Sequence, residues 1–234
     1  EAAVLVDELV PAVQDAGCEV VICTPYTDLV TAVEKTKGTN IHVGAENVHF
    51  EKSGAFTGEI SPAMLREAGC TWVLTGHSER RHVLGESPDF VGKKTAFALE
   101  QGFSVILCIG ETLAERKAGK LNSILWLQLE RGLAGLGPNA DYSRLAVAYE
   151  PVWAIGTGQT ASDEDIRMVH TLVRELLSSL LGSNGIGIQI LYGGSVKPDN
   201  AKAILSLDNV DGLLVGGASL QAQSFADIVR ADLA

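Results

Sequence analysis

Seven short apolar segments alternate with helical segments along the chain, and this alternation limits the fold more than any other feature. The apolar segments are continuous rather than alternating in polarity, as strands buried on both faces of a parallel sheet require. Strands that alternate with helices predict a parallel sheet with helical crossovers. The predicted strands are Glu19–Thr24, Ile41–Glu46, Trp72–Gly76, Ser104–Gly110, Leu145–Tyr149, Gly187–Tyr192 and Gly212–Gly216.

Eight helical units accompany these strands, the fifth of them in two parts. Ser162 precedes the longest helix, and three acidic residues in its first turn suit the positive end of the helix dipole. Pro11 is expected to kink or end the first helix. The predicted helices are Ala2–Val10, Tyr26–Thr36, Ser61–Ala68, Asp89–Gln101, Thr112–Lys117 with Leu121–Leu133, Ser162–Leu181, Asp199–Leu205 and Ala222–Leu233.

The first helix has no strand before it, which is unusual for a crossover helix. One more strand before Glu1 would give eight βα units, the number that closes a parallel barrel. We therefore expect one α/β domain over residues 1–234, a (β/α)8 barrel that lacks its first strand in this sequence. An open, doubly wound sheet is the alternative architecture.

Composition excludes several functional classes. The net charge of −11 disfavours nucleic acid and anionic membrane surfaces as partners. No apolar run reaches the length of a membrane span. The four cysteines are scattered, as reduced thiols of a cytoplasmic protein would be, and the five histidines form no metal-binding motif, so no metal site is expected.

Glu150 stands at the end of a predicted strand, where the reactive groups of a barrel collect. A glutamate in this position is often only a solvated residue or a salt-bridge partner. The residues that follow, from Pro151 to Ile155, are too apolar for an ordinary surface loop, and glycines come after them. Apolar bulk with flexible ends is typical of a lid that excludes water, and a carboxylate beneath it can act as a general base.

His77 ends another predicted strand, in the stretch LTGHSERR. A structural histidine bonded to the backbone is one interpretation. The other is functional, because Ser78 and Glu79 resemble the first turn of a helix. A helix N-terminus disfavours the imidazolium, so the ring would remain neutral and donate a hydrogen bond to a carbonyl oxygen.

Two glycine pairs, in Tyr192–Val196 (YGGSV) and Val215–Ser219 (VGGAS), each follow a strand and precede a helix. Either alone could be a tight turn. Together, after the last two strands of a barrel, they match the position of a phosphate site built from backbone N–H groups. A third glycine stretch, Gly156–Ala161, fits a dinucleotide fingerprint, but it does not follow a strand directly and no acidic residue lies at the required distance, so NAD binding is not expected.

Taken together, the stretches AYEPVWAIGTG, GHSERR, GAFTGEIS, YGGSV and VGGASL resemble the triosephosphate isomerase family over essentially the whole chain. The resemblance implies a TIM (β/α)8 barrel that interconverts dihydroxyacetone phosphate and D-glyceraldehyde 3-phosphate through an enediolate. It implies that Glu150 is the base and His77 the neutral electrophile, with no cofactor. It places Glu79 at the rim of the pocket and Tyr192 against the closed lid. The implied phosphate-binding residues are Gly156, Ser195, Gly216 and Gly217.

The resemblance also implies a homodimer. The loop Gly44–Ser61 is unusually apolar for a surface segment. In the family this loop enters a partner subunit, which would bring Thr57 near the partner's active site. A pairing of Glu59 with Arg80 across the interface is a weaker expectation.

Two further functions stay open, and one of them, an inactive barrel, follows from a departure from the family pattern. The family has a first strand ending in Asn-x-Lys, whose lysine supplies a fixed positive charge, and this sequence contains no such segment. We expect the sequence to be an incomplete record of a normal isomerase. The alternatives are another phosphate-binding barrel enzyme, such as an epimerase or a lyase, and a catalytically inactive barrel that only binds.

Overall fold

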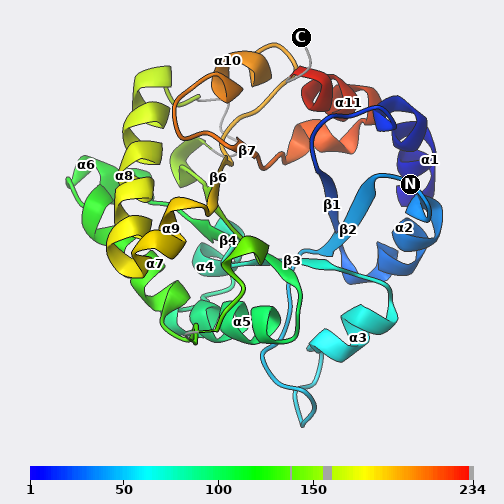
Figure 1. Cartoon of the computed structure of the whole chain (residues 1–234), viewed down its shortest axis with the longest axis horizontal. Coiled ribbons are helices and arrows are strands. Elements are labelled where there is room, and N and C mark those ends of the chain that lie inside the picture. Colours follow the sequence, from blue (N-terminus) through cyan, green and yellow to red (C-terminus); the bar gives the residue numbers. More distant parts are fainter. Residues whose placement is uncertain (138, 155–159, 232–234) are drawn as a thin grey trace.

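The computed structural model describes residues 1–137, 139–154 and 160–231, and its seven parallel strands form one curved sheet in chain order (Figure 1). All seven predicted strands are therefore confirmed, with ends that differ by a few residues. The strands are β1 (Val20–Thr24), β2 (Ile41–Ala45), β3 (Trp72–Thr75), β4 (Ser104–Ile109), β5 (Leu145–Tyr149), β6 (Gln189–Tyr192) and β7 (Gly212–Leu213).

The helices surround the outer face of the sheet (Figure 1). Short 3₁₀ turns follow β1, β5 and β7, namely η1 (Tyr26–Asp28), η3 (Val152–Ala154) and η4 (Gly217–Leu220), and a fourth, η2 (Tyr142–Arg144), directly precedes β5. The α-helices are α1 (Ala2–Val13), α2 (Leu29–Thr36), α3 (Pro62–Glu67), α4 (Ser78–His82), α5 (Pro88–Glu100), α6 (Leu113–Lys117), α7 (Leu121–Leu133), α8 (Asp163–Leu181), α9 (Ser183–Ile186), α10 (Ala201–Leu205) and α11 (Ala222–Arg230).

Local capping explains where several helices begin. The side chains of Ser61, Ser87 and Ser162 each accept a hydrogen bond from a backbone N–H in the first turn of α3, α5 and α8. Thr112 and Glu115 form a complete capping box at α6. These caps satisfy donors that the helix itself leaves unpaired, so the helix starts could be predicted from sequence.

Two predicted element ends were wrong: the end of helix α1 and the end of strand β7. Helix α1 does not end at Pro11 but continues to Val13. Val13 is buried with Leu9 against α11, and this burial outweighs the hydrogen bond that proline removes. Strand β7 covers only Gly212 and Leu213, whereas the apolar pattern continues to Gly216.

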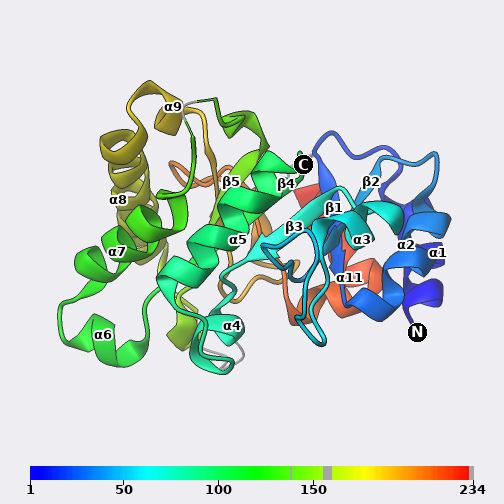
Figure 2. The ribbon, with the colours of Figure 1, turned by 90° about the horizontal axis from the view of Figure 1, so that it is seen from below.

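Alternate side chains of β4 pack on opposite faces of the sheet. Val105 and Leu107 join the main core between the sheet and the helices, whereas Ile106 and Cys108 lie in a smaller inner cluster. Figure 2 shows α4 and α6 at one end of the barrel, the end at which β3 and β4 finish. In the described part of the chain, no helix is both long enough and apolar enough to span a membrane.

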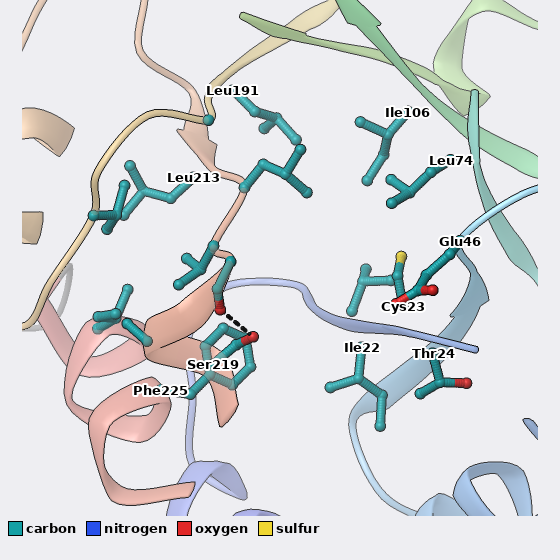
Figure 3. Close-up of a pocket in the computed structure, with 18 of the residues that line it drawn as sticks. Ile22, Cys23, Thr24, Glu46, Leu74, Ile106, Leu191, Leu213, Ser219 and Phe225 are labelled. Carbon is teal, nitrogen blue, oxygen red and sulfur yellow. Dashed lines mark hydrogen bonds between the residues drawn. The ribbon is translucent and has the colours of Figure 1, made fainter. Parts of the chain in front are cut away.

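The sheet is not closed between its first and last strands. Among the described residues β1 pairs only with β2, and β7 pairs only with β6. A cleft of about 1770 Å³ occupies this gap and extends to the carboxyl ends of the strands. Figure 3 shows Ile22, Leu74 and Ile106 directed into it. The structure thus confirms a seven-stranded version of the barrel.

Candidate functional site

The ends of β3 and β5 bring His77 and Glu150 into direct contact. The His77 Nε2 atom lies 2.9 Å from Glu150 Oε1. The Glu150 side chain is 3% exposed and that of His77 is 26% exposed, so the carboxylate is shielded while the ring faces the cleft. The structure therefore unites the two titratable residues that the sequence placed at separate strand ends.

The hydrogen bonds of His77 define its tautomer. His77 is the N-cap of α4, and its Nδ1 accepts a hydrogen bond from the Glu79 N–H at 3.4 Å. An accepting Nδ1 carries no proton, so in the neutral ring the proton is on Nε2. His77 Nε2 then donates to Glu150 in the ligand-free site and can donate to a substrate oxygen in a complex.

Backbone groups fix the Glu150 carboxylate from the other side. The carboxylate Oε2 accepts a hydrogen bond from the Ser78 N–H at 3.0 Å. The backbone N–H of Glu150 donates to the Ile109 carbonyl at 2.7 Å. A Cβ on Gly110 would overlap the Glu150 carbonyl oxygen, so only glycine allows this close approach of β4 and β5. The base is therefore held by the end of β4 and by the first turn of α4, which follows β3.

The electrostatics around His77 oppose its expected neutrality. Burial lowers the pKa of His77, but the hydrogen bond and charge of Glu150, with the charges of Glu79 and Glu46, raise it above its usual value overall. Burial also raises the pKa of Glu46. In the ligand-free cleft the three carboxylates of Glu150, Glu79 and Glu46 favour the imidazolium form of His77. The neutral ring expected in the working enzyme therefore remains a prediction.

The two glycine turns open into the same cleft as the histidine and the glutamate. Within the described ranges, the N–H groups of Gly216 and Gly217 donate to no acceptor. Nothing lies within 4 Å of a Cβ built on either residue, so the backbone is accessible. Such N–H groups can bind a phosphate without a cationic side chain. The predicted site residues that line the cleft are His77, Glu79, Arg80, Glu150, Ser195, Gly216 and Gly217.

Comparison with known proteins identifies the family. The triosephosphate isomerase family model matches residues 1–232. The chain belongs to the triosephosphate isomerase family. It is 56% identical to the triosephosphate isomerase of Nitratidesulfovibrio vulgaris strain Miyazaki F over 91% of this chain and 85% of that protein. It is 53% identical to the triosephosphate isomerase of Oleidesulfovibrio alaskensis over 99% of this chain and 94% of that protein.

A solved structure agrees with this assignment. The crystal structure of triosephosphate isomerase from Bartonella henselae superposes with a TM-score of 0.90 at 39% identity. The match covers 100% of this chain and 93% of that one. The resemblance seen in the motifs therefore extends to the whole backbone.

The start of the predicted lid in this isomerase-family chain is anchored by a buried acid. Glu111, fully buried after β4, accepts hydrogen bonds from the Trp153 Nε1 at 2.9 Å and the Tyr149 hydroxyl at 3.2 Å. Arg116 donates to the same oxygen at 3.0 Å and stacks over the Trp153 ring. The sequence assigned no role to Glu111, and its position directly after a strand was the only available signal. Gly156 lies outside the described residues.

Tyr192 and Glu79, which the isomerase resemblance assigned to the lid and the rim, lie in very different environments. Tyr192 is fully buried, and burial raises its pKa to about 12. Its hydroxyl lies beneath Gly194, where a side chain would collide with it. The Glu79 side chain is 73% exposed at the rim of the cleft. Their roles in the lid and the rim remain predictions.

The loop expected at an isomerase dimer interface projects from the barrel below α3 (Figure 1). Its base is a stack of aromatic rings, with His49 4.6 Å from Phe50 and 4.4 Å from Phe56 between ring centroids. Thr57, the next residue after Phe56, is exposed. Within the chain, Glu59 lies 3.4 Å from His49 and Arg80 lies 2.6 Å from Glu86, so the expected Glu59–Arg80 pair is not formed inside one subunit.

A buried lysine that the sequence analysis overlooked connects this loop to α5. Lys94 is fully buried and donates to Asn47 at 2.8 Å and to Glu86 at 2.5 Å. Burial lowers the pKa of Lys94, and Glu86 opposes that shift. Lys94 lies on α5 away from the cleft, and the cations that line the cleft within the described residues are Arg80 and Lys197. In the same residues, no cluster of three metal-ligating side chains occurs.

Proposed function

We propose that this chain is a triosephosphate isomerase that interconverts dihydroxyacetone phosphate and D-glyceraldehyde 3-phosphate. The observation that carries the proposal is the 2.9 Å contact between His77 Nε2 and Glu150 Oε1 in a cleft that also holds both glycine turns. A base, a hydrogen-bond donor and a phosphate cradle are the three parts that this reaction requires. Family membership supports the same conclusion.

The proposed proton transfer uses the two residues in sequence. The Glu150 carboxylate removes a proton from C1 of the ketone, and the electron pair of that bond forms the C1–C2 double bond of an enediolate. His77 Nε2–H turns from Glu150 to the substrate oxygens and stabilises their negative charge. Glu150 then returns the proton to C2. The hydroxyl proton of the C1 oxygen passes to the C2 oxygen by way of His77 Nε2, so that the C1 oxygen becomes the aldehyde, the C2 oxygen becomes a hydroxyl, and the net composition does not change.

Phosphate binding is assigned to the turns after β6 and β7. We propose that Ser195, Gly216 and Gly217 donate backbone N–H bonds to the phosphate, with Gly156 contributing from the lid. The accessible backbone at Gly216 and Gly217 supports this assignment. The cleft is rich in carboxylates. Backbone N–H groups suit an anionic ligand in such a cleft because they bind it without a cationic side chain, which the carboxylates would otherwise pair with.

The test is an assay of the purified chain with dihydroxyacetone phosphate, together with deuterium incorporation at C1 from heavy water. Glu150→Gln is expected to lower both rates by about a thousandfold or more, the effect of removing a general base. Glu175→Gln provides the control, because Glu175 is exposed on α8 away from the cleft.

Two results would contradict the proposal. One is a parent chain that binds a phosphate-bearing enediol mimic but neither turns over substrate nor exchanges the C1 proton, which would indicate a binding-only barrel. The other is equal loss in the Glu150 and Glu175 variants, which would place the base elsewhere.

We also propose an isologous homodimer formed through the projecting loop of residues 46–61. Phe56 is 41% exposed in that loop, and Val83 and Leu84 after α4 are 78% and 62% exposed. These apolar side chains support a partner surface, with Thr57 entering the partner's cleft. In a Glu59–Arg80 pair across the interface, Glu59 would contact Arg80 as well as His49, and Arg80 would contact Glu59 as well as Glu86.

Sedimentation velocity tests the dimer. The parent is expected to sediment as a dimer at micromolar concentration, and Phe56→Asp with Thr57→Arg as a monomer. Val4→Asp is the control, because Val4, 59% exposed on α1, is an apolar surface residue away from the loop. A monomeric parent, or a dimer that survives the loop variant, would show that this loop is not the interface.

We propose one domain over residues 1–234 and a cytoplasmic location. The continuous sheet and the main core, which includes residues from Leu29 to Ile228, support one cooperative unit. The four cysteines are free, two of them buried, and this supports a reducing compartment. A calorimetric enthalpy well above the van't Hoff value would contradict one domain, and recovery in a membrane or secreted fraction would contradict the location.

A further inference from the structure

Arg81 is a buried cation beneath the site, and the mechanism proposed above does not use it. It belongs to α4, four residues after His77, and is only 9% exposed. Its Nε donates to the Gly76 carbonyl at 2.7 Å, and its Nη2 donates to the Cys108 carbonyl at 2.8 Å. One guanidinium therefore joins the end of β3 to β4.

Both acceptors belong to residues that support the reacting pair. Gly76 directly precedes His77, and the Cys108 thiol lies against Glu150. Burial, followed by the charge of Glu150, raises the pKa of that thiol well above its usual value, so Cys108 remains a neutral donor beside the carboxylate. Arg81 thus contacts the supports of both His77 and Glu150 without touching either side chain.

The backbone at Gly76 is shaped around the guanidinium. Gly76 has a φ of +68°, the left-handed region that favours glycine. A Cβ built there would lie 2.5 Å from Arg81 Nη2 and 2.7 Å from Val91. Glycine is therefore required at this position both for the turn and for the space that the arginine fills.

The charge of Arg81 is not neutralised by a direct ion pair. In the described part of the chain, no carboxylate lies within ion-pair distance of it, and its buried Nη1 has no hydrogen-bond partner. Burial lowers the pKa of Arg81, and its interactions with the Cys108 side chain and with the charges of Glu150 and Glu86 oppose that shift. Burying a cation without an ion pair lowers the stability of the folded protein, so Arg81 at this position indicates a role beyond packing.

We propose that Arg81 is a positioning residue for proton transfer: it fixes the strand ends that carry His77 and Glu150. This inference rests on the proposed function of Glu150 as the base. The other groups facing the carboxylate are the His77 ring, the Ser78 N–H and the Cys108 thiol, with Glu46 and Glu79 around the ring. Arg81 is the permanently charged cation in this set.

Two substitutions separate its charge from its hydrogen bonds. Arg81→Gln removes the charge but retains a donor for one carbonyl, whereas Arg81→Lys retains the charge and loses the two-pronged contact. Arg174→Gln is the matched control. Arg174 also donates to backbone carbonyls, those of Ile186 and Ile188, but it lies near the start of β6, at the opposite end of the barrel from the site.

The measurements are the NMR titration of the His77 ring and the separate values of kcat and KM. Arg81→Gln and Arg81→Lys both lose the two-pronged contact. In each variant the His77 midpoint should fall, because the contact with Glu150 that raises it is held less firmly, and kcat should fall by about tenfold at similar KM. Arg174→Gln should reduce thermal stability without changing the His77 midpoint or kcat.

The NMR titration distinguishes failure of this inference from failure of the proposed function, since it requires no turnover. An unchanged His77 midpoint in both Arg81 variants overturns the positioning role even if activity falls. An equal change of the midpoint in Arg174→Gln reduces Arg81 to a structural residue. If Arg81→Gln does not fold, the Arg81→Lys titration and its kcat still decide the outcome, because parent-like values there contradict the proposal.

Discussion

The barrel has a closed side, centred on β4 and β5, and an open side, between β7 and β1. On the closed side the two strands pair continuously from Val105 with Leu145 to Ile109 with Tyr149, and all of β5 is buried. On the open side β7 has two half-buried residues, and four of the five residues of β1 are also only half-buried. Figure 3 shows the resulting space.

The two sides carry different parts of the reaction. His77 and Glu150 lie at the ends of β3 and β5, where neighbouring strands hold them within hydrogen-bond distance. The proposed phosphate turns, at Ser195 and at Gly216, lie beside the open side. Proton transfer is sensitive to small displacements, whereas phosphate binding by backbone donors tolerates a more open surrounding. Changes on the closed side should therefore affect kcat, and changes on the open side should affect KM.

The largest effect is expected from crowding the closed side at Gly110. In Gly110→Ala the new methyl group would overlap the Glu150 carbonyl oxygen, so β5 must move. A displacement of about 1 Å at the base is expected to lower kcat by about a hundredfold, with about 1–3 kcal/mol of lost stability. Steady-state kinetics and urea denaturation measure both. Parent-like kcat would show that the base does not depend on this strand contact.

Cavity formation compares the packing of the two sides. Leu107→Ala, at a fully buried position of β4, is expected to lower the free energy of unfolding by about 2–5 kcal/mol. Leu213→Ala, at a half-buried position of β7, should cost less than about 1.5 kcal/mol. Equal losses in denaturant titrations would mean that the open side is packed as tightly in solution as the closed side.

An acid on the open side tests phosphate binding without disturbing the base. Gly217→Asp places a carboxylate near the proposed phosphate and is expected to raise KM about tenfold or more at similar kcat. Gly217→Ala is the control, because a Cβ at this position meets nothing within 4 Å and should be tolerated. A fall in kcat alone in the aspartate variant would contradict the division between the two sides.

The smallest effect concerns the titration of His77. The Glu150 carboxylate contributes to the raised pKa of His77, so Glu150→Gln should lower the NMR midpoint of the ring. A raised folded-state pKa stabilises the protein at pH values below the unfolded imidazole value of about 6.5, and this contribution is lost as pH rises through the folded value. The variant should therefore lose the corresponding pH dependence of stability. An unchanged midpoint would mean that His77 and Glu150 are not coupled in solution.

Much of the fold followed from local patterns. The apolar segments predicted every strand, and Ser162 with the acidic residues after it predicted where α8 begins. His77 and Glu150 were recognised because each follows a strand. The error at Pro11 shows the limit of such rules, since the burial of Val13 depends on α11, which comes from the other end of the chain.

The sequence by itself determined the alternation of strands and helices, the family motifs and the two residues proposed for proton transfer. Only the tertiary structure decided that Arg81 lies buried beneath both of them, that Glu111 anchors Trp153, and that Lys94 serves the projecting loop rather than the cleft. Periodicity and capping are properties of neighbouring residues and can be read locally. A buried charge is defined by groups from several distant segments, and these come together only when the sheet has folded.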